Sequence, residues 1–193
     1  MSDFIFYFKI GLYHVLDFQA YDHILFLIVL SVIYNKNQLK EVLWLITLFT
    51  IGHTLTLLLS AYNYISINEQ LIEFLIPVTI FITGLVNVFT AKKSSLEKKS
   101  LNLFFALFFG LIHGLGFSNY FKMILGKKEE KLLPLLEFAI GVEAAQVIIV
   151  IFILLLGILL TTVFNVNRRD WILVSSSIVI GFSLHMIFNR VFW

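Results

Sequence analysis

The sequence contains no cysteine, and this absence limits the chemistry open to the chain. Disulfides and thiolate metal sites are excluded. Any metal must therefore be held by imidazole, carboxylate, amide or hydroxyl groups. That ligand set suits nickel, zinc, cobalt, manganese or iron rather than Cu(I).

Charged residues are also scarce. They make up 13% of the 193 residues, whereas soluble domains carry about 25%. The net charge of +2 offers no strongly basic surface, so we expect no nucleic acid among the partners. The sequence shows no internal repeat, no low-complexity tract and no nucleotide-binding motif, so transport by this chain would be passive or ion-coupled.

Apolar residues fill the chain instead, at 60% of the composition with a mean hydropathy of +0.95. A soluble protein of this size could not cover so much apolar surface, which indicates that the chain lies in a bilayer. A spanning helix needs about 20 mainly apolar residues. Five stretches without Asp, Glu, Lys or Arg are predicted to span: Val42–Ile65, Phe74–Ala91, Ser100–Phe121, Ala144–Asn167 and Trp171–Asn189. The fourth of these is expected to begin earlier, near Leu132, and to carry Glu137 and Glu143 into or near the membrane.

The first segment, Phe4–Tyr34, is apolar but holds several polar residues and is too long for one straight span. We predict a short amphipathic or re-entrant helix over residues 4–17, a break near Asp17–Tyr21 and a span through Asp22–Tyr34. A continuous tilted helix is the alternative. The predicted fold is an all-α transmembrane bundle of six spans plus a short N-terminal helix, forming a single domain over residues 1–193.

The basic residues of the linkers predict the orientation. Linkers 35–41, 91–100 and 165–170 alternate along the chain, so they share one side, and together they hold eight lysines and arginines. The intervening linkers hold three. The positive-inside rule places the basic side in the cytoplasm, so this is a multi-pass protein with these three linkers cytoplasmic.

Ionisable groups inside spans are costly to insert and are therefore candidates for a functional site. All five histidines lie in or beside predicted spans, and carboxylates and an amide accompany them at similar depth in the outer half of the membrane. Imidazole and carboxylate together bind borderline divalent metals. The candidate metal ligands are His14, Asp22, His23, His53, Glu73, His113, Glu143 and Gln146. His185, near the end of the last span, is expected to sit at the interface.

The spacing of two of these histidines tests the predicted break. On an unbroken helix His14 and His23 would be nine residues apart, about half a rotation. They could not then face one site, so if both are ligands the chain must bend between them.

Five short motifs carry a resemblance to a known family. They are GLYH at 11–14, YDHILF at 21–26, FTIGHTLT at 49–56, GLIHGLGF at 110–117 and FAIGVEAAQ at 138–146. In this order and spacing they resemble the shorter, second branch of the HupE/UreJ family of bacterial membrane proteins. The resemblance implies a nickel or cobalt permease of the bacterial inner membrane linked to hydrogenase and urease maturation, with Asp22 and His23 matching the family's His-Asp-His motif. The chain departs from the family pattern at Val15, Thr54 and Ala139.

The favoured interpretation is a permease for a divalent transition metal ion, nickel first, with cobalt or zinc as alternatives. Two other classes stay open. One is an intramembrane zinc hydrolase with Glu143 or Asp22 as base. The other is a non-transporting assembly subunit whose polar groups only bond helices together. The expected partners are the metal ion and membrane lipids, with a homo-oligomer and a link to a metalloenzyme maturation system left open.

Overall fold

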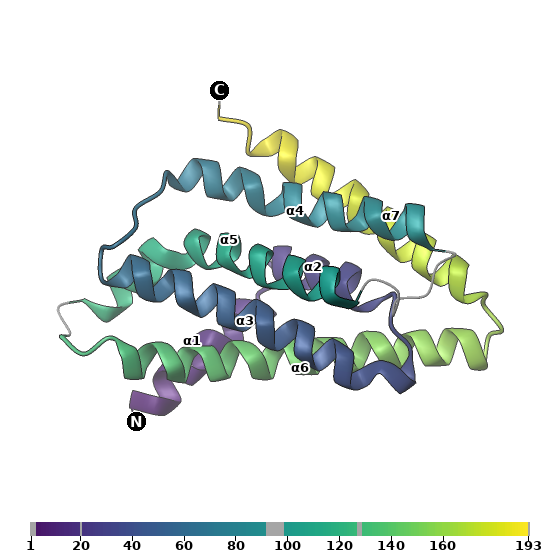
Figure 1. Ribbon diagram of the computed structural model, residues 1–193, viewed down its shortest axis with the longest axis horizontal. Coiled ribbons are helices and arrows are strands. Elements are labelled where there is room, and N and C mark those ends of the chain that lie inside the picture. Colours follow the sequence, from purple (N-terminus) through teal and green to yellow (C-terminus); the bar gives the residue numbers. More distant parts are fainter. Residues whose placement is uncertain (1–2, 20, 92–98, 127–128, 193) are drawn as a thin grey trace.

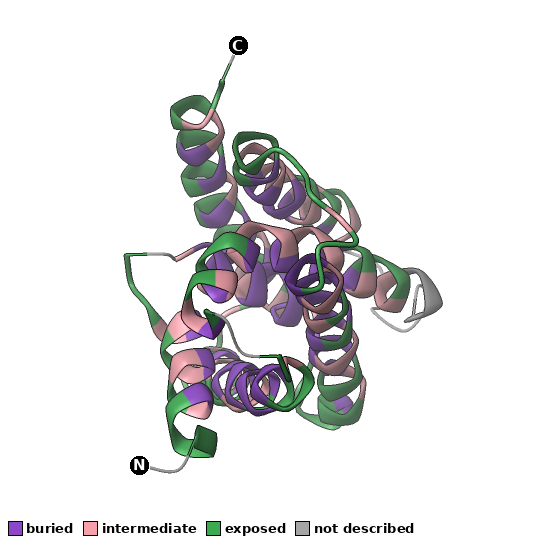
Figure 2. Ribbon diagram, turned by 90° about the vertical axis from the view of Figure 1, so that its left-hand side faces the viewer, coloured by how far each residue is buried: buried purple, intermediate pink, exposed green. Residues whose placement is uncertain are grey.

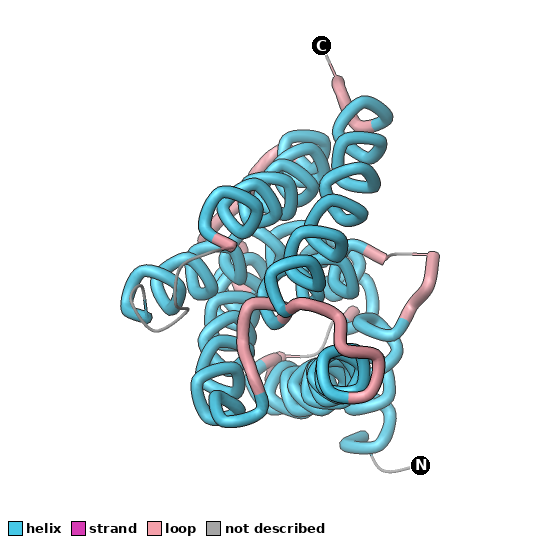
Figure 3. Tube along the Cα trace, turned by 90° about the vertical axis from the view of Figure 1, so that its right-hand side faces the viewer, coloured by secondary structure: helices cyan, strands magenta, loops and turns pink. Residues whose placement is uncertain are grey.

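The computed structural model describes residues 3–19, 21–91, 99–126 and 129–192, and all their regular structure is helical (Figure 3). Seven α-helices and one 3₁₀ helix follow one another along the chain. They are α1 (Asp3–Leu16), α2 (Asp22–Ser31), η1 (Lys36–Gln38), α3 (Leu39–Ala61), α4 (Glu69–Thr90), α5 (Lys99–Leu125), α6 (Leu132–Thr162) and α7 (Arg168–Asn189). The predicted all-α class is confirmed.

Five of the helices, α3 to α7, are long and apolar enough to cross a membrane. Helix α6 begins at Leu132 as expected and takes Glu137 and Glu143 into its length. The expected span Asp22–Tyr34 is shorter than predicted, because α2 covers only ten residues, about 15 Å at the α-helical rise. That is half of a hydrocarbon core about 30 Å thick. In Figure 1, α1 and α2 in succession lead the chain from the left end of the bundle toward the right end, so together they replace one straight span.

The predicted break in the first segment is present between Leu16 and Asp22. The side chain of Asp17 accepts a hydrogen bond of 2.8 Å from the backbone N–H of Gln19. This local bond competes with helix continuation. Asp22 then opens α2, where its negative charge meets the positive end of the helix dipole. Two acidic residues thus account for one helix end and one helix start.

The connections alternate between the two ends of the bundle. In Figure 1 the α2–α3 and α6–α7 connections lie at the right, where α4 ends and α5 begins. The α3–α4 and α5–α6 connections lie at the left, as does the N-terminus. This agrees with the prediction that linkers 35–41 and 165–170 lie on the same side of the membrane. Most of the predicted linker 91–100 lies outside the described residues.

Glycine allows two helix pairs to approach closely. A Cβ atom at Gly110 would strike the Phe49 carbonyl oxygen, and one at Gly114 would strike the His53 carbonyl oxygen, so α5 lies backbone to backbone against α3. Helices α1 and α6 make the same kind of contact. A Cβ atom at Gly11 would strike the Phe138 carbonyl oxygen, and one at Gly141 would strike the Phe8 carbonyl oxygen. Small residues of this kind drive helix association in membranes. Figure 2, an end-on view, shows the buried faces of these helices turned into the bundle and their exposed faces turned outward.

Candidate metal centre

Four of the five histidines meet inside the bundle, one from each of α1, α2, α3 and α5. The ring centroid of His23 lies 4.6 Å from that of His14, 6.1 Å from that of His53 and 5.5 Å from that of His113. The rings of His14 and His53 are 5.9 Å apart. Because α1 stops before α2 begins, His14 and His23 face each other, which an unbroken helix would have prevented.

Three of these rings are buried, that of His14 is half-buried, and all four carry unused nitrogen atoms. His53 is fully buried, and His23 and His113 are almost so. Within the described part of the chain, the Nε2 atoms of all four rings and the Nδ1 atom of His53 are buried without a hydrogen-bond partner. Buried polar atoms in native proteins are nearly always satisfied. Several such atoms gathered in one place therefore indicate a ligand.

Hydrogen bonds orient two of the rings. His23 Nδ1 lies 3.1 Å from Asp22 Oδ1, and His113 Nδ1 lies 2.9 Å from the Phe109 carbonyl oxygen. A carboxylate and a carbonyl only accept, so each Nδ1 carries the proton and donates it. Each Nε2 atom, buried and without a partner, then carries the lone pair that could bind a metal ion. This is the arrangement by which proteins orient imidazole ligands toward metals.

The donor set fits a divalent transition metal. One nitrogen from each of His14, His23 and His53 lies within 4.8 Å of the other two. Nitrogen ligands around one ion with bonds of about 2.1 Å would be roughly 3.4 Å apart. Small side-chain movements would therefore bring the three nitrogens onto one ion, with His113 beside them.

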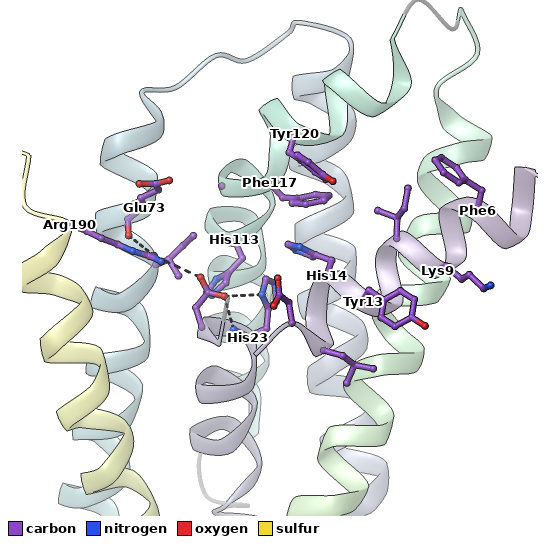
Figure 4. Close-up of a pocket in the computed structure, with 16 residues that line it drawn as sticks. Phe6, Lys9, Tyr13, His14, His23, Glu73, His113, Phe117, Tyr120 and Arg190 are labelled. Carbon is purple, nitrogen blue, oxygen red and sulfur yellow. Dashed lines mark hydrogen bonds and ion pairs between the residues drawn. The ribbon is translucent and has the colours of Figure 1, made fainter. Parts of the chain in front are cut away.

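A pocket of about 840 Å³ leads to this centre (Figure 4). His14, Asp22, His23 and His113 line its inner part. Its mouth is formed by the first two turns of α1 and α4, the last two turns of α5 and Arg190 directly after α7, with Lys9, Glu73 and Tyr120 among the lining residues. These turns lie at the end of the bundle opposite linkers 35–41 and 165–170. The centre is therefore open toward that end.

Aromatic rings close the centre on the other side. Phe26, three residues after His23, and Phe49, four residues before His53, are both fully buried. Their ring centroids lie 5.3 Å and 5.1 Å from that of His113. An ion at the histidines would meet these two rings before it could move toward the basic linkers.

Arg190 reaches the centre and was not among the predicted site residues. Its Nη1 atom donates to the Glu73 carbonyl oxygen at 3.2 Å and lies 3.8 Å from Asp22 Oδ2. That carbonyl is available because Pro77, four residues later, has no N–H to donate to it. A proline inside a predicted span, with an arginine just after another span at the same end, was the signal that could have identified this contact.

The remaining predicted ligands lie elsewhere. Glu73 is exposed at the pocket mouth. Glu143 and Gln146 face threonines of α3, and no contact among the described residues joins them to the histidine rings. His185, which was not a predicted ligand, is exposed on α7 and bonds to Asn189. We call the set of His14, Asp22, His23, His53 and His113 the histidine centre.

Comparison with known proteins identifies the chain. The family model described as HupE/UreJ protein matches residues 1–190. No curated protein and no solved structure matches. The HupE/UreJ family is generally linked to the uptake of nickel or cobalt, and the five long apolar helices agree with a membrane protein. Since the match covers nearly every residue, the chain belongs to the HupE/UreJ family.

Proposed function

We propose that this protein is a permease that carries a divalent transition metal ion, with nickel favoured over cobalt or zinc, through the histidine centre. One observation carries the proposal: four histidines from four helices meet beside a pocket, their Nε2 atoms are buried without a hydrogen-bond partner, and one nitrogen from each of three of them lies within 4.8 Å of the other two. Imidazole is a preferred ligand of these ions. Family membership favours nickel or cobalt as the transported ion.

Each residue of the centre has a distinct part in capturing the ion. His14, His23 and His53 supply the three closest nitrogens, and His113 adds a fourth from α5. Asp22 holds the His23 ring through Nδ1 and contributes negative charge that attracts a cation. Glu73 at the mouth adds a carboxylate on the way in.

We infer the direction of transport from the side on which the pocket opens. The positive-inside rule places linkers 35–41 and 165–170 in the cytoplasm, and the pocket opens at the opposite end. The ion would enter from outside, bind, and pass Phe26 and Phe49 after these rings move aside. The structure thus resembles an outward-open state of an inner-membrane permease, and the delivered ion would supply metalloenzyme maturation.

The test compares the purified wild-type protein with His23→Ala and His113→Ala, and His185→Ala serves as the control. Metal content is measured by mass spectrometry, and uptake of labelled nickel is measured in cells. A permease predicts weak metal binding by wild type together with uptake that both centre variants abolish. A transport site must bind weakly enough to release its ion.

A zinc-dependent intramembrane hydrolase is the second candidate, and the three-histidine group favours it. Three protein ligands with an open fourth position are typical of catalytic zinc, and Asp22 lies beside them as a base. The enzyme is favoured over the permease if wild type holds about one tightly bound zinc per chain, the centre variants lose that zinc, and wild type takes up no nickel. If the variants lose only stability, the centre serves assembly and both proposals fail.

A further inference from the structure

A second polar cluster lies between α3 and α6, separate from the histidine centre. Thr47 Oγ1 donates to Glu143 Oε1 at 2.6 Å, and Thr50 Oγ1 lies 2.9 Å from Gln146 Oε1. Gln146 is fully buried and Thr50 almost so, while Glu143 is half-buried. Two neighbouring pairs of oxygen-bearing side chains therefore join α3 to α6.

This cluster continues from the histidine centre toward the basic linkers. His53, Thr50 and Thr47 are spaced by three residues each, so they form a stripe along one side of α3. At the helical rise, Thr47 is roughly 9 Å from His53 along the axis. The displacement is toward the start of α3, the end at which linker 35–41 lies. The cluster thus lies on the far side of the histidines from the pocket mouth.

The hydrogen bonds around Thr50 leave one buried oxygen without a donor. The Thr50 hydroxyl has one proton but two acceptors within reach, the Ile46 carbonyl at 3.0 Å and Gln146 Oε1 at 2.9 Å. Turning the amide of Gln146 resolves this, because Nε2 then donates to Thr50, which donates to Ile46. The position now assigned to Gln146 Nε2, buried and unpartnered, becomes a carbonyl oxygen. That oxygen is a ligand for a cation.

Charge supports the same conclusion. No lysine or arginine among the described residues forms an ion pair with Glu143, and its contact is the Thr47 hydroxyl. A carboxylate within a membrane span is stabilised by a positive partner, and without one it is costly. A passing cation would supply that charge.

We propose that Glu143, Thr47, Thr50 and Gln146 form a second cation site, which receives the divalent ion from the histidine centre on its way to the cytoplasm. The inference rests on the proposed permease function. Carboxylate, hydroxyl and amide oxygens bind nickel or zinc less well than imidazole does, and they suit harder divalent ions. The second site therefore holds the transported ion weakly and favours its release.

The first experiment uses Glu143→Gln, which keeps an acceptor for Thr47 but removes the charge. Glu130→Gln, an exposed position before α6, is the matched control. Nickel affinity of the purified protein is measured by calorimetry, and nickel uptake is measured in proteoliposomes with no sodium or proton gradient. We expect Glu143→Gln to keep its nickel affinity within about two-fold and to lose about ten-fold or more in uptake. The control should change neither.

The second experiment probes the site directly. In a His23→Ala, His53→Ala background, Mn²⁺ binding is measured by electron paramagnetic resonance, because oxygen ligands suit this hard ion. We expect weak Mn²⁺ binding that Glu143→Gln and Thr47→Val each remove.

The outcomes separate this inference from the proposed function. Unchanged uptake in Glu143→Gln, a ten-fold loss of its nickel affinity, or Mn²⁺ binding that does not need Glu143 would each overturn the second site. Absence of uptake by wild type would instead overturn the permease, and the Mn²⁺ result would still decide whether the second cation site exists.

Discussion

His113 and His185 look alike in the sequence, since each stands in a long apolar stretch in the C-terminal half of its helix, yet the structure places them in opposite surroundings. His113 is buried, is oriented by the Phe109 carbonyl, leaves its Nε2 without a partner, and lies 5.5 Å from the His23 ring. His185 is exposed on α7, and its Nε2 already has a partner in Asn189. A histidine within a span is therefore a candidate ligand only when its neighbours leave a buried nitrogen unused.

The helices that carry the two residues differ in the same way. Helix α5 lies against α3 with glycine at the contact, and its His113 lies within ring distance of His23. Helix α7 has Gly181 four residues before His185, and a Cβ atom there would meet nothing within 4 Å. Close helix packing, rather than residue type, thus decides which histidines form the centre.

The strongest test of this comparison is His53→Ala. His53 is fully buried and both its ring nitrogens lack partners, so we expect nickel affinity to fall by more than about 100-fold, beyond the loss caused by removing an outer partner of a ligand. Calorimetry on the purified protein measures it. Retention of wild-type affinity would show that the metal binds elsewhere.

A smaller effect is expected from Asp22→Asn. The substitution removes the charge beside His23 and weakens the hydrogen bond that its Nδ1–H donates. Nickel affinity should therefore fall by about 10- to 100-fold. Asp170→Asn, in the exposed first turn of α7, loses the same charge and should leave affinity unchanged. Equal effects of the two variants would point to net charge rather than the orientation of His23.

The packing difference is tested by Gly114→Ala against Gly181→Ala. A Cβ atom at Gly114 would strike the His53 carbonyl oxygen and the Thr56 hydroxyl, so this variant should lose roughly 1–3 kcal/mol in the free energy of unfolding. At Gly181 the same change should be neutral or stabilising by up to about 1 kcal/mol, because alanine favours the helix. Thermal unfolding in detergent measures both. Equal stability of the pair would contradict close α3–α5 packing.

The smallest effect is expected from His185→Ala. An exposed side chain outside the centre should change nickel affinity and uptake by less than about two-fold. Titration and uptake assays on this variant, run beside His113→Ala, complete the comparison. A large loss would place His185 in the transport path.

Much of the fold was predictable because each cause lies within a short stretch of chain. Long runs without charge predict the spans, and Asp17 and Asp22 mark the break between α1 and α2. The break was the favoured prediction, and helical geometry required it if His14 and His23 were to face one site. The length of α2 was not, since an apolar run that ends a helix at Ser31 looks the same as one that continues it.

The sequence identified most of the polar residues of the site, but it did not show which of them lie together. Depth in the membrane brought Glu143 and Gln146 to the same level as the histidines, but depth says nothing of rotation about the bundle axis. The structure joins these two residues to Thr47 and Thr50 of α3. It also brings Arg190 to Asp22 through a carbonyl that Pro77 leaves without its helical donor.

The sequence by itself determined that this is a helical membrane protein with imidazole and carboxylate groups inside its spans, because hydropathy and the cost of burying charge act on each segment separately. Only the tertiary structure decided which of those groups share a site, which helix turns its histidine away, and where the pocket opens. Those outcomes depend on how helices rotate and pack against one another, through contacts such as that of Gly114 with His53, between residues far apart in the chain.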